Sequence, residues 1–357
     1  MTRRRLLRHS LSTAALLAPA TAFHVLAEAG TPAAVPPLSN PGDAPAPWSK
    51  AEAHMGCLWT LTLPDTPPAV AEKAATAVFA EIHRLNQIFS DYETTSELNQ
   101  LCAAAGQKNP LPVSRELFDI LTKSRRMSEL SRGAFDITLA PSVRLWRRSR
   151  RRGELPHADA IAKARALAGW EHIQLDAANQ RALLTKPGMQ LDLGGIAKGW
   201  TQDACLTLLR EKFGITCLLL DAAGEVAVGT PPPGREHWRI GVQPTPGETP
   251  SRFALRETNI ATSGDHYQFV EIDGRRYSHL IDPATGLGSI VSRQGTIIAP
   301  TGAEADPLTK FLCLMDSALS LPLIQKNFPG IHARVTESLP GEALKVHQTP
   351  GFPAAVS

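Results

Sequence analysis

Apolar residues recur every three or four positions in four stretches of the chain, which is the spacing of amphipathic helices. These stretches begin near Val70, Ser114, Ile196 and Leu308. The Ser114 side chain can cap the N-terminus of the second helix, and Gly214 is a typical stop for the third. The pattern therefore predicts four helices, each with one apolar face turned toward a core.

Shorter apolar segments between turn residues predict strands at 217–220, 225–228 and 297–299. Asp273-Gly274 separates two further segments, 267–272 and 276–280, and this dipeptide is a strong hairpin signal. The sequence contains no repeat of fixed period, and it mixes hairpins with helices. The expected fold is α+β: a single domain with antiparallel or mixed sheets and packed helices.

The first 29 residues are predicted to be an export signal. Arginines at positions 3–5 precede a weakly apolar run, and Ala27-Glu28-Ala29 is a small-x-small cleavage site. The paired arginines favour the twin-arginine route, with a Sec signal as the alternative, and predict a periplasmic protein. The run is too short and too polar for a membrane-spanning helix, and no later segment is expected to span a membrane.

Composition indicates the domain limits and argues against several kinds of site. Residues 30–50 are rich in Pro and Ala and are predicted to be a linker, which leaves a domain over 51–352 and a tail over 353–357. A net charge of +3 on 357 residues does not argue for a nucleic-acid partner. The arginine-rich run 144–152 is interpreted as a solvated face or loop. Five cysteines without a C-x-x-C pair argue against a disulfide framework or a zinc site.

The segment from Asp192 to Lys198 is the most informative candidate site. It is predicted to be a strand end, a tight turn at Gly194 and Gly195, and a helix start. Glycines let the backbone approach a ligand closely, and a helix N-terminus attracts phosphate. The segment therefore indicates a nucleotide site, although a tight turn with an ordinary surface lysine is the alternative.

Two further segments are suited to a flat heterocycle. Asp136 and Thr138 share one face if their segment is extended, with Phe135 beside them; the alternative is a turn with a core phenylalanine. Tyr92 lies just past a predicted helix end, where its ring could stack on a base or pack on the domain.

Two segments near the C-terminal end carry candidate catalytic groups. Strand alternation predicts Tyr277 and His279 on one face, and with Arg276 this hairpin is suited to a diphosphate and a proton relay. The alternative is a structural histidine. Asp306 and Thr309 share a helix face and could hold a hard cation, unless Asp306 with the following proline is only a helix cap.

All these segments, in this order, resemble the FAD:protein FMN transferases (the ApbE family). The resemblance extends from about His54 to Phe352. It rests on the ordered motifs Met-Gly (55–56), Ser-Glu-Leu-Asn (96–99), Gly-Ala-Phe-Asp-Ile-Thr (133–138), Asp-Leu-Gly-Gly-Ile-Ala-Lys-Gly (192–199), Thr-Ser-Gly (262–264), His-Leu-Ile-Asp-Pro-Ala-Thr-Gly (279–286) and the Ala-Asp helix (305–306).

The resemblance implies an enzyme that cuts FAD at its diphosphate, moves FMN to a threonine or serine hydroxyl of an acceptor protein and releases AMP. The implied flavin-nucleotide contacts are Met55, Tyr92, Ala134, Phe135, Asp136, Asp192 and Lys198. The implied Mg²⁺ ligands are Gly195, through its carbonyl, and Asp306, with Thr309 as a further candidate. We assign His279 to proton transfer and Arg276 to a phosphate contact as hypotheses.

Two departures from the family pattern stand out. Lys310 lies where the family usually has threonine or serine; it could displace the cation, or point away while Thr309 ligates. Ala223 lies where the family typically has a glycine. Two other functions therefore stay open: a metal-dependent FAD pyrophosphatase, and a flavin-binding protein that has lost transfer. The implied acceptor is an exported protein, such as part of a respiratory or electron-transfer complex.

Overall fold

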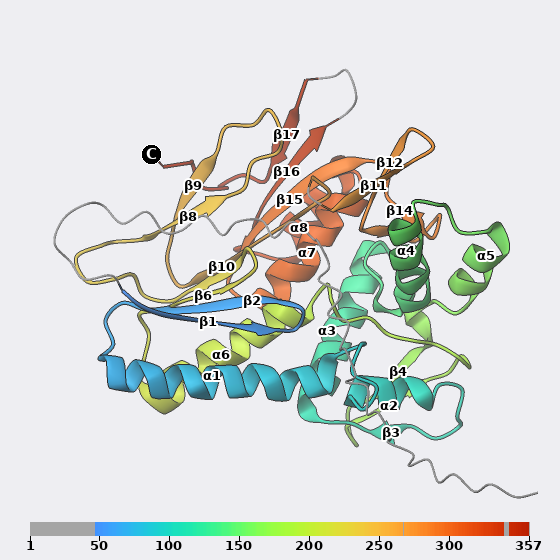
Figure 1. Ribbon diagram of the computed structural model, residues 1–357, viewed down its shortest axis with the longest axis horizontal. Coiled ribbons are helices and arrows are strands. Elements are labelled where there is room, and N and C mark those ends of the chain that lie inside the picture. The colour runs from blue at the N-terminus through green and yellow to red at the C-terminus, as the bar shows by residue number, and fades with distance from the viewer. Residues whose placement is uncertain (1–46, 267, 339–342, 357) are drawn as a thin grey trace, which may run out of the picture. The chain divides into compact units, whose positions relative to one another are not determined.

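The computed structural model describes residues 47–266, 268–338 and 343–356, which belong to one compact unit (Figure 1). The predicted export signal, most of the predicted linker, Tyr267 and the last residue of the tail lie outside these residues. None of the helices in the described part is both long and apolar enough to cross a membrane.

An eight-stranded sheet is the centre of the fold, and every neighbouring pair in it is antiparallel. Its strands, in spatial order, are β1 (Trp48–His54), β2 (Cys57–Leu63), β6 (Leu219–Ala222), β7 (Glu225–Val228), β10 (Thr258–Gly264), β15 (Ser292–Ala299), β16 (His332–Ser338) and β17 (Lys345–Gln348). In the middle of the sheet Ile260 lies opposite Ile298.

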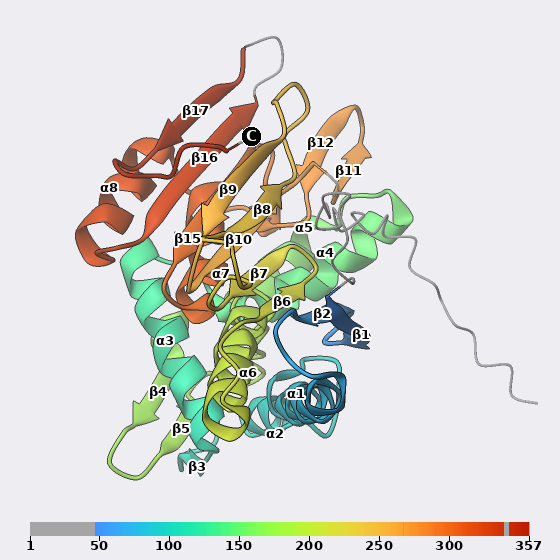
Figure 2. The ribbon, with the colours of Figure 1, turned by 90° about the vertical axis from the view of Figure 1, so that its left-hand side faces the viewer.

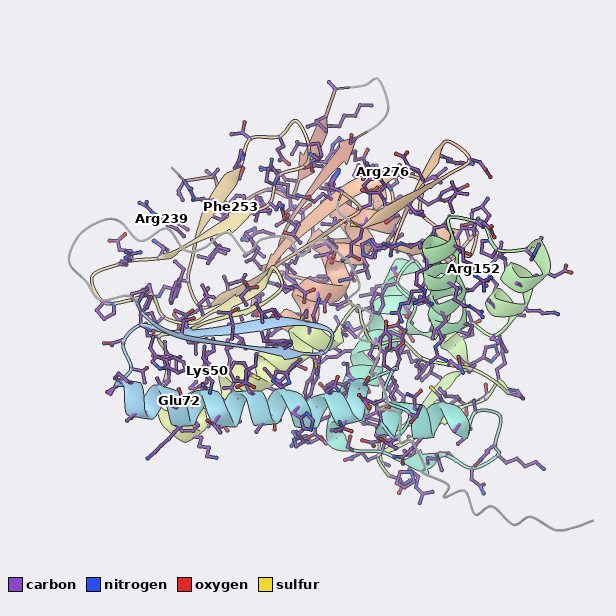
Figure 3. All side chains as sticks on the ribbon, in the orientation of Figure 1. Lys50, Glu72, Arg152, Arg239, Phe253 and Arg276 are labelled. Carbon is purple, nitrogen blue, oxygen red and sulfur yellow. The ribbon has the colours of Figure 1, made fainter. Side chains whose placement is uncertain are left out.

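The two faces of the sheet carry different layers, because successive side chains of a strand point to opposite sides. On β15, Ile297 packs with residues of the helical layer, whereas Ile298 packs with the hairpin of β8 (Trp238–Val242) and β9 (Ser251–Leu255). Figure 2 shows these two layers on either side of the sheet. At one end of the sheet, Lys50 of β1 forms a 2.6 Å ion pair with Glu72 (Figure 3).

The helical layer is formed by α1 (Pro68–Phe89), α6 (Ala197–Phe213) and α7 (Gly302–Leu314), with α6 packed between the other two. The other helices are α2 (Glu97–Ala103), α3 (Arg115–Ser131), α4 (Ala140–Arg152), α5 (Ala158–Ala166) and α8 (Ser317–Asn327). The Ser114 hydroxyl accepts a hydrogen bond from the Leu117 amide and so caps α3. The left-handed Gly214 ends α6.

Smaller elements complete the domain. Strands β3 (Leu111–Pro112), β5 (Arg181–Leu184) and β4 (Ile173–Asp176) form a three-stranded sheet, and β13 (Ile281–Asp282) pairs with β14 (Leu287–Gly288). The hairpin of β11 (Phe269–Ile272) and β12 (Arg275–Ser278) turns at Asp273 and Gly274, both of which have positive φ. Two single 3₁₀ turns lie at Ile137–Leu139 and Trp170–His172.

The α+β prediction, the four helices and the Asp273-Gly274 hairpin are confirmed. Four local predictions are wrong. Strand β1 begins at Trp48, inside the predicted linker. Residues 189–193 are irregular rather than a strand. Helix α7 begins at Gly302, so Asp306 lies within it and is not its cap. Strand β12 ends at Ser278, so it does not place Tyr277 and His279 on one strand face.

The turn between β6 and β7 contains a strained alanine. Ala223 has a φ of 55° and Gly224 a φ of 91°, which is the geometry of a two-residue hairpin turn. A Cβ is unfavourable at positive φ, so Ala223→Gly is expected to raise the free energy of unfolding by about 1 kcal/mol. Urea denaturation measures this change.

Ala178→Gly is the matched control for that prediction. Ala178 lies in the turn between β4 and β5 and has no positive φ, so the added chain entropy should lower its stability slightly. Equal effects of the two substitutions would contradict the assignment of strain to Ala223.

Candidate active site

Helices α6 and α7 meet at their backbones, and this contact fixes the site. A Cβ added to Gly199 would lie 2.0 Å from the carbonyl oxygen of Gly302, so only glycine fits at this crossing. The Asp203 carboxylate accepts hydrogen bonds from the amides of Gly302 and Ala303 at 2.7 and 2.9 Å. Burial raises the pKa of Asp203 to about 6, against the effect of these two amides. Asp203 thereby anchors the start of α7 to α6.

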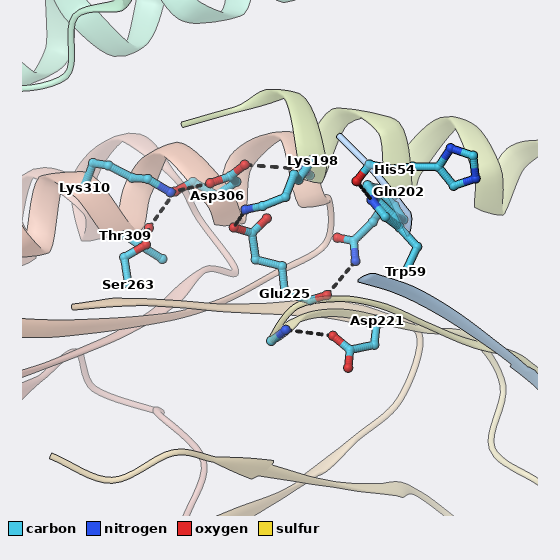
Figure 4. Close-up of polar contacts among 12 residues, drawn as sticks. His54, Trp59, Lys198, Gln202, Asp221, Glu225, Ser263, Asp306, Thr309 and Lys310 are labelled. Atoms are coloured by element: carbon cyan, nitrogen blue, oxygen red, sulfur yellow. Dashed lines mark hydrogen bonds and ion pairs between the residues drawn. The ribbon is translucent and has the colours of Figure 1, made fainter. Parts of the chain in front are cut away.

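Four charged side chains gather where α6, α7 and β7 meet, and we call them the charged cluster: Lys198, Glu225, Asp306 and Lys310. Lys198 of α6 pairs with Glu225 of β7, and Lys310 pairs with Asp306 one turn earlier on α7 (Figure 4). The Gly199 amide also approaches the Asp306 carboxylate, at 3.4 Å. Asp306 is completely buried and Glu225 nearly so.

Burial and mutual attraction compete in this cluster. Burial alone would raise the pKa of Asp306, but Lys310 and Lys198 hold it below its ordinary value. Burial would lower the pKa of Lys198, but the carboxylates of Glu225 and Asp306 outweigh it and raise that pKa. Burial and the charge of Asp306 raise the pKa of Glu225, against the effect of Lys198. The cluster thus keeps the partly buried Lys198 charged.

The residues expected to hold Mg²⁺ do not fit that ion in this arrangement. Mg²⁺ takes oxygen ligands and is repelled by nearby positive charge. Lys310 does not point away: its ammonium already holds the Asp306 carboxylate. The Thr309 hydroxyl donates to the Asp306 backbone carbonyl and lies 2.8 Å from the hydroxyl of Ser263 on β10. No group of three or more His, Cys, Asp or Glu side chains that could hold a metal occurs among the described residues.

The glycine turn lies beside the charged cluster. The Asp192 carboxylate accepts a 2.8 Å hydrogen bond from the Gly194 amide. A Cβ on Gly195 would lie 3.2 Å from the Phe135 ring and 3.5 Å from the Lys310 Cε. Gly195 therefore lies between an aromatic side chain and the lysine of α7, with space for no larger side chain unless these neighbours move.

A second group of charges surrounds Arg147 of α4, which we call the Arg147 group: Asp91, Tyr92, Arg147 and Asp192. The guanidinium lies 3.2 Å from Asp91 and 3.1 Å from Asp192, and it covers the Tyr92 ring at 4.9 Å. Tyr92 is 72% exposed, so its ring does not pack into the core. The arginine-rich run is therefore a helix with one member in the candidate site, rather than only a solvated face.

The other four predicted flavin-nucleotide contacts are Phe135, Asp136, Ala134 and Met55. Phe135 is buried, and Asp136 caps a 3₁₀ turn through bonds from the amide and hydroxyl of Thr138, so this segment is not extended. Burial raises the pKa of Asp136. Ala134 directly precedes Phe135, ahead of the 3₁₀ turn, and is partly buried. Met55 lies between the two main core clusters, 3.8 Å from the Thr201 hydroxyl of α6.

Helix α4 also packs against the end of β12, next to His279. The Trp146 indole donates a 2.9 Å hydrogen bond to the Ser278 carbonyl, and its ring packs against Tyr277. The His279 Nδ1 donates to the Gln268 carbonyl at 3.2 Å, which leaves Nε2 as the ring nitrogen that can accept a proton.

His279 lies within the electrostatic influence of the charged cluster. Burial, followed by the positive charges of Arg150, Lys310 and Lys198, lowers the pKa of His279 to about 4. The backbone carbonyl of Gln268 opposes this shift only in part. His279 is therefore a neutral imidazole at neutral pH, as a proton acceptor must be.

Arg276 is engaged elsewhere. Its guanidinium lies 3.3 Å from the Asp265 carboxylate and 3.8 Å from the centre of the Phe269 ring. Asp265 also accepts a 2.8 Å bond from the Ser292 hydroxyl. The structure therefore shows Arg276 bracing its own hairpin, and none of its contacts is to the charged cluster.

Sequence reasoning missed Glu225, Arg147 and Asp203 as members of the site. Glu225 directly follows the turn at Ala223 and Gly224, and an acid at the start of a buried strand signals a partner. Asp203 lies on the same face of α6 as Gly199, one turn later. Arg147 had no local signal, because its partners are 45 and 56 residues away.

A separate hollow lies on the opposite face of the sheet. It is lined by residues including Gln243, Glu248 and Arg334, together with Gln294 and Thr296 of β15. These β15 side chains alternate with Gly295 and Ile297, which face α7 and the helical layer. The hollow thus has no residue in common with the charged cluster.

Comparison with known proteins identifies the family of the chain. The model of the ApbE family matches residues 55–335. A protein named FAD:protein FMN transferase from Klebsiella pneumoniae (strain 342) is 32% identical over 309 residues, covering 84% of this chain and 86% of the relative. A protein of the same name from Treponema pallidum (strain Nichols) is 31% identical over 304 residues, covering 80% and 83%.

Solved structures show the same fold. The flavin transferase ApbE from Vibrio cholerae superposes with a TM-score of 0.75 at 25% identity, covering 86% of this chain and 98% of that one. The apo form of the Pseudomonas stutzeri flavinyl transferase ApbE gives a TM-score of 0.74 at 28% identity, covering 86% and 96%.

Proposed function

Because the chain belongs to the ApbE family, we propose that it is an FAD:protein FMN transferase that moves FMN from FAD to an acceptor protein. The observation that carries the proposal is that the candidate site combines four features. They are the Gly194–Gly195 turn, the charged cluster, the exposed Tyr92 ring and the neutral His279.

The reaction is a phosphoryl transfer. The oxygen of an acceptor threonine or serine hydroxyl attacks the phosphorus on the FMN side of the diphosphate. The bond from that phosphorus to the bridging oxygen breaks, and AMP leaves with the bridging oxygen. The hydroxyl proton moves to Nε2 of His279, since Nδ1 is held by the Gln268 carbonyl.

The chain's own residues supply charge and position. Helix α6 begins directly after the glycine turn, and the positive end of its dipole favours an anion there. Lys198 stays protonated because Glu225 and Asp306 lie beside it. Tyr92 offers an exposed ring for a flat heterocycle, although Arg147 covers it in this structure. The donor set does not fit Mg²⁺, so the proposed reaction contains no metal step.

One assay separates transfer from its two rivals. The enzyme is incubated with FAD and an exported respiratory flavoprotein as candidate acceptor, and the products are separated by chromatography and intact-mass spectrometry. Covalent flavin on the acceptor supports transfer. Free FMN with AMP supports a pyrophosphatase, and bound but unchanged FAD supports a binding protein.

The pH dependence of the reaction follows from His279. Because kcat/KM reports groups of the free enzyme, its acid limb is expected near pH 4 rather than near the ordinary histidine pKa of about 6.5. His279 is neutral above pH 4 and becomes protonated, and inactive as a base, only below it. A limb near pH 6.5 that disappears in His279→Ala would contradict the lowered pKa.

We further propose that the protein acts in the periplasm and modifies an exported partner. The support is the sequence of the first 29 residues, with its paired arginines and small-x-small site. Fusion of these residues to a reporter that requires export tests this proposal, with Arg3 and Arg4 replaced by lysine as the control for the twin-arginine route.

A further inference from the structure

Lys310 is fixed in the site by two contacts on its own helix. Its ammonium pairs with the Asp306 carboxylate one turn earlier and also lies 3.1 Å from the Asp306 backbone carbonyl. The Lys310 side chain is only 12% exposed. A surface lysine has its ammonium in water, whereas this one is held in place among protein atoms.

The position of Lys310 is beside the glycine turn. The 3.5 Å approach of its Cε to a Cβ on Gly195 shows that the lysine side chain passes directly next to the Gly195 backbone. The resemblance places Mg²⁺ between Gly195 and Asp306. The lysine therefore runs through the place that the ion would take.

The charges of the cluster point to the same conclusion. Glu225 and Asp306 balance Lys198 and Lys310, so the four groups together carry no net charge. Without Lys310 the remaining three would carry one negative charge, which attracts a divalent cation. With Lys310 present, that attraction is lost, and a positive group already faces the turn.

We propose that the Lys310 ammonium, positioned by Asp306, is the cation that binds the FAD diphosphate in this enzyme, so that FAD binding and FMN transfer need no divalent metal. This inference rests on the proposed function. A tethered ammonium brings one charge, and the N–H that it does not donate to Asp306 can reach a phosphate oxygen. It is present whatever the metal supply.

The test compares the wild-type enzyme with Lys310→Thr in EDTA and in excess MgCl₂. FAD affinity is measured by quenching of flavin fluorescence, and heat stability with MgCl₂ alone by thermal unfolding. For the wild type, MgCl₂ should change neither the FAD affinity nor the unfolding temperature. For Lys310→Thr in EDTA, FAD affinity should fall about 10- to 100-fold, and MgCl₂ should restore it and raise the unfolding temperature.

Controls keep the outcomes distinct. Lys326→Thr removes an exposed lysine of α8 and should leave FAD affinity and its indifference to MgCl₂ unchanged. The measurement on the wild type does not depend on whether any variant folds. If the FAD affinity of the wild type is lost in EDTA and returns with MgCl₂, the proposal is overturned. If the wild type forms covalent flavin only with Mg²⁺, this inference fails while the proposed function stands. If it forms none with or without Mg²⁺, the proposed function fails.

Discussion

Replacement of His279 by alanine is expected to lower the rate of FMN transfer by about 100-fold or more, with FAD affinity close to that of the wild type. The reason is the arrangement around the ring: Nδ1 is committed to the Gln268 carbonyl, and Nε2 is free to take the hydroxyl proton. Burial, together with nearby positive charges, lowers the pKa of His279 and holds the imidazole neutral. Single-turnover kinetics measure the transfer rate, and fluorescence quenching measures FAD affinity.

His347→Ala is the control for this prediction, because His347 is exposed on the edge strand β17. It should leave both quantities unchanged. The acid limb of the kcat/KM profile should be lost in His279→Ala and kept in His347→Ala. Turnover retained by His279→Ala would remove this residue from the mechanism.

Replacement of Lys198 by methionine is expected to lower the free energy of unfolding by about 3–5 kcal/mol. Glu225 and Asp306 are 5% and 0% exposed, so removal of Lys198 leaves two buried carboxylates and one ammonium, that of Lys310, which pairs with Asp306. The loss should become smaller as the pH falls, because protonation of Glu225 then removes the unpaired charge. Urea denaturation at several pH values measures the effect.

A second substitution identifies the cause. The double variant Lys198→Met with Glu225→Gln should recover at least half of the lost stability, since it removes the unpaired carboxylate. Lys123→Met is the matched control: Lys123 and Asp119 form an exposed 3.6 Å pair on α3, which is worth about 1 kcal/mol or less. Equal losses from Lys198→Met and Lys123→Met would show that the buried cluster has no special stabilising role.

Local patterns predicted the parts of the fold that local physics decides. The repeat in α1, the Ser114 cap, the Gly214 stop and the Asp273-Gly274 turn each depend on neighbouring residues. The start of α7 was missed because its anchor, Asp203, lies about 100 residues earlier on another helix. Asp306 followed by proline resembled a helix cap, because the local sequence does not show that Asp203 holds the helix start at Gly302.

The candidate site also divides into residues that local patterns mark and contacts that depend on the assembled fold. Asp192, Lys198 and Asp306 were predicted as site residues because glycines or helical spacing marked them. The pairing of Lys198 with Glu225 and the bracing of Arg276 by Asp265 depend on how the strands assemble, and no local pattern encodes them. The opposite error occurred with the arginine run 144–152. Its composition suggested a solvated face, but the fold places Arg147 against two partly buried acids, Asp91 and Asp192.

A crystal structure of the enzyme with FAD bound tests the central claim most directly. The account predicts that the diphosphate lies between the Gly194–Gly195 turn and the ammoniums of Lys198 and Lys310, with a flat ring of FAD against Tyr92. FAD bound instead in the hollow on the other face of the sheet, beside Gln243 and Arg334, would contradict it.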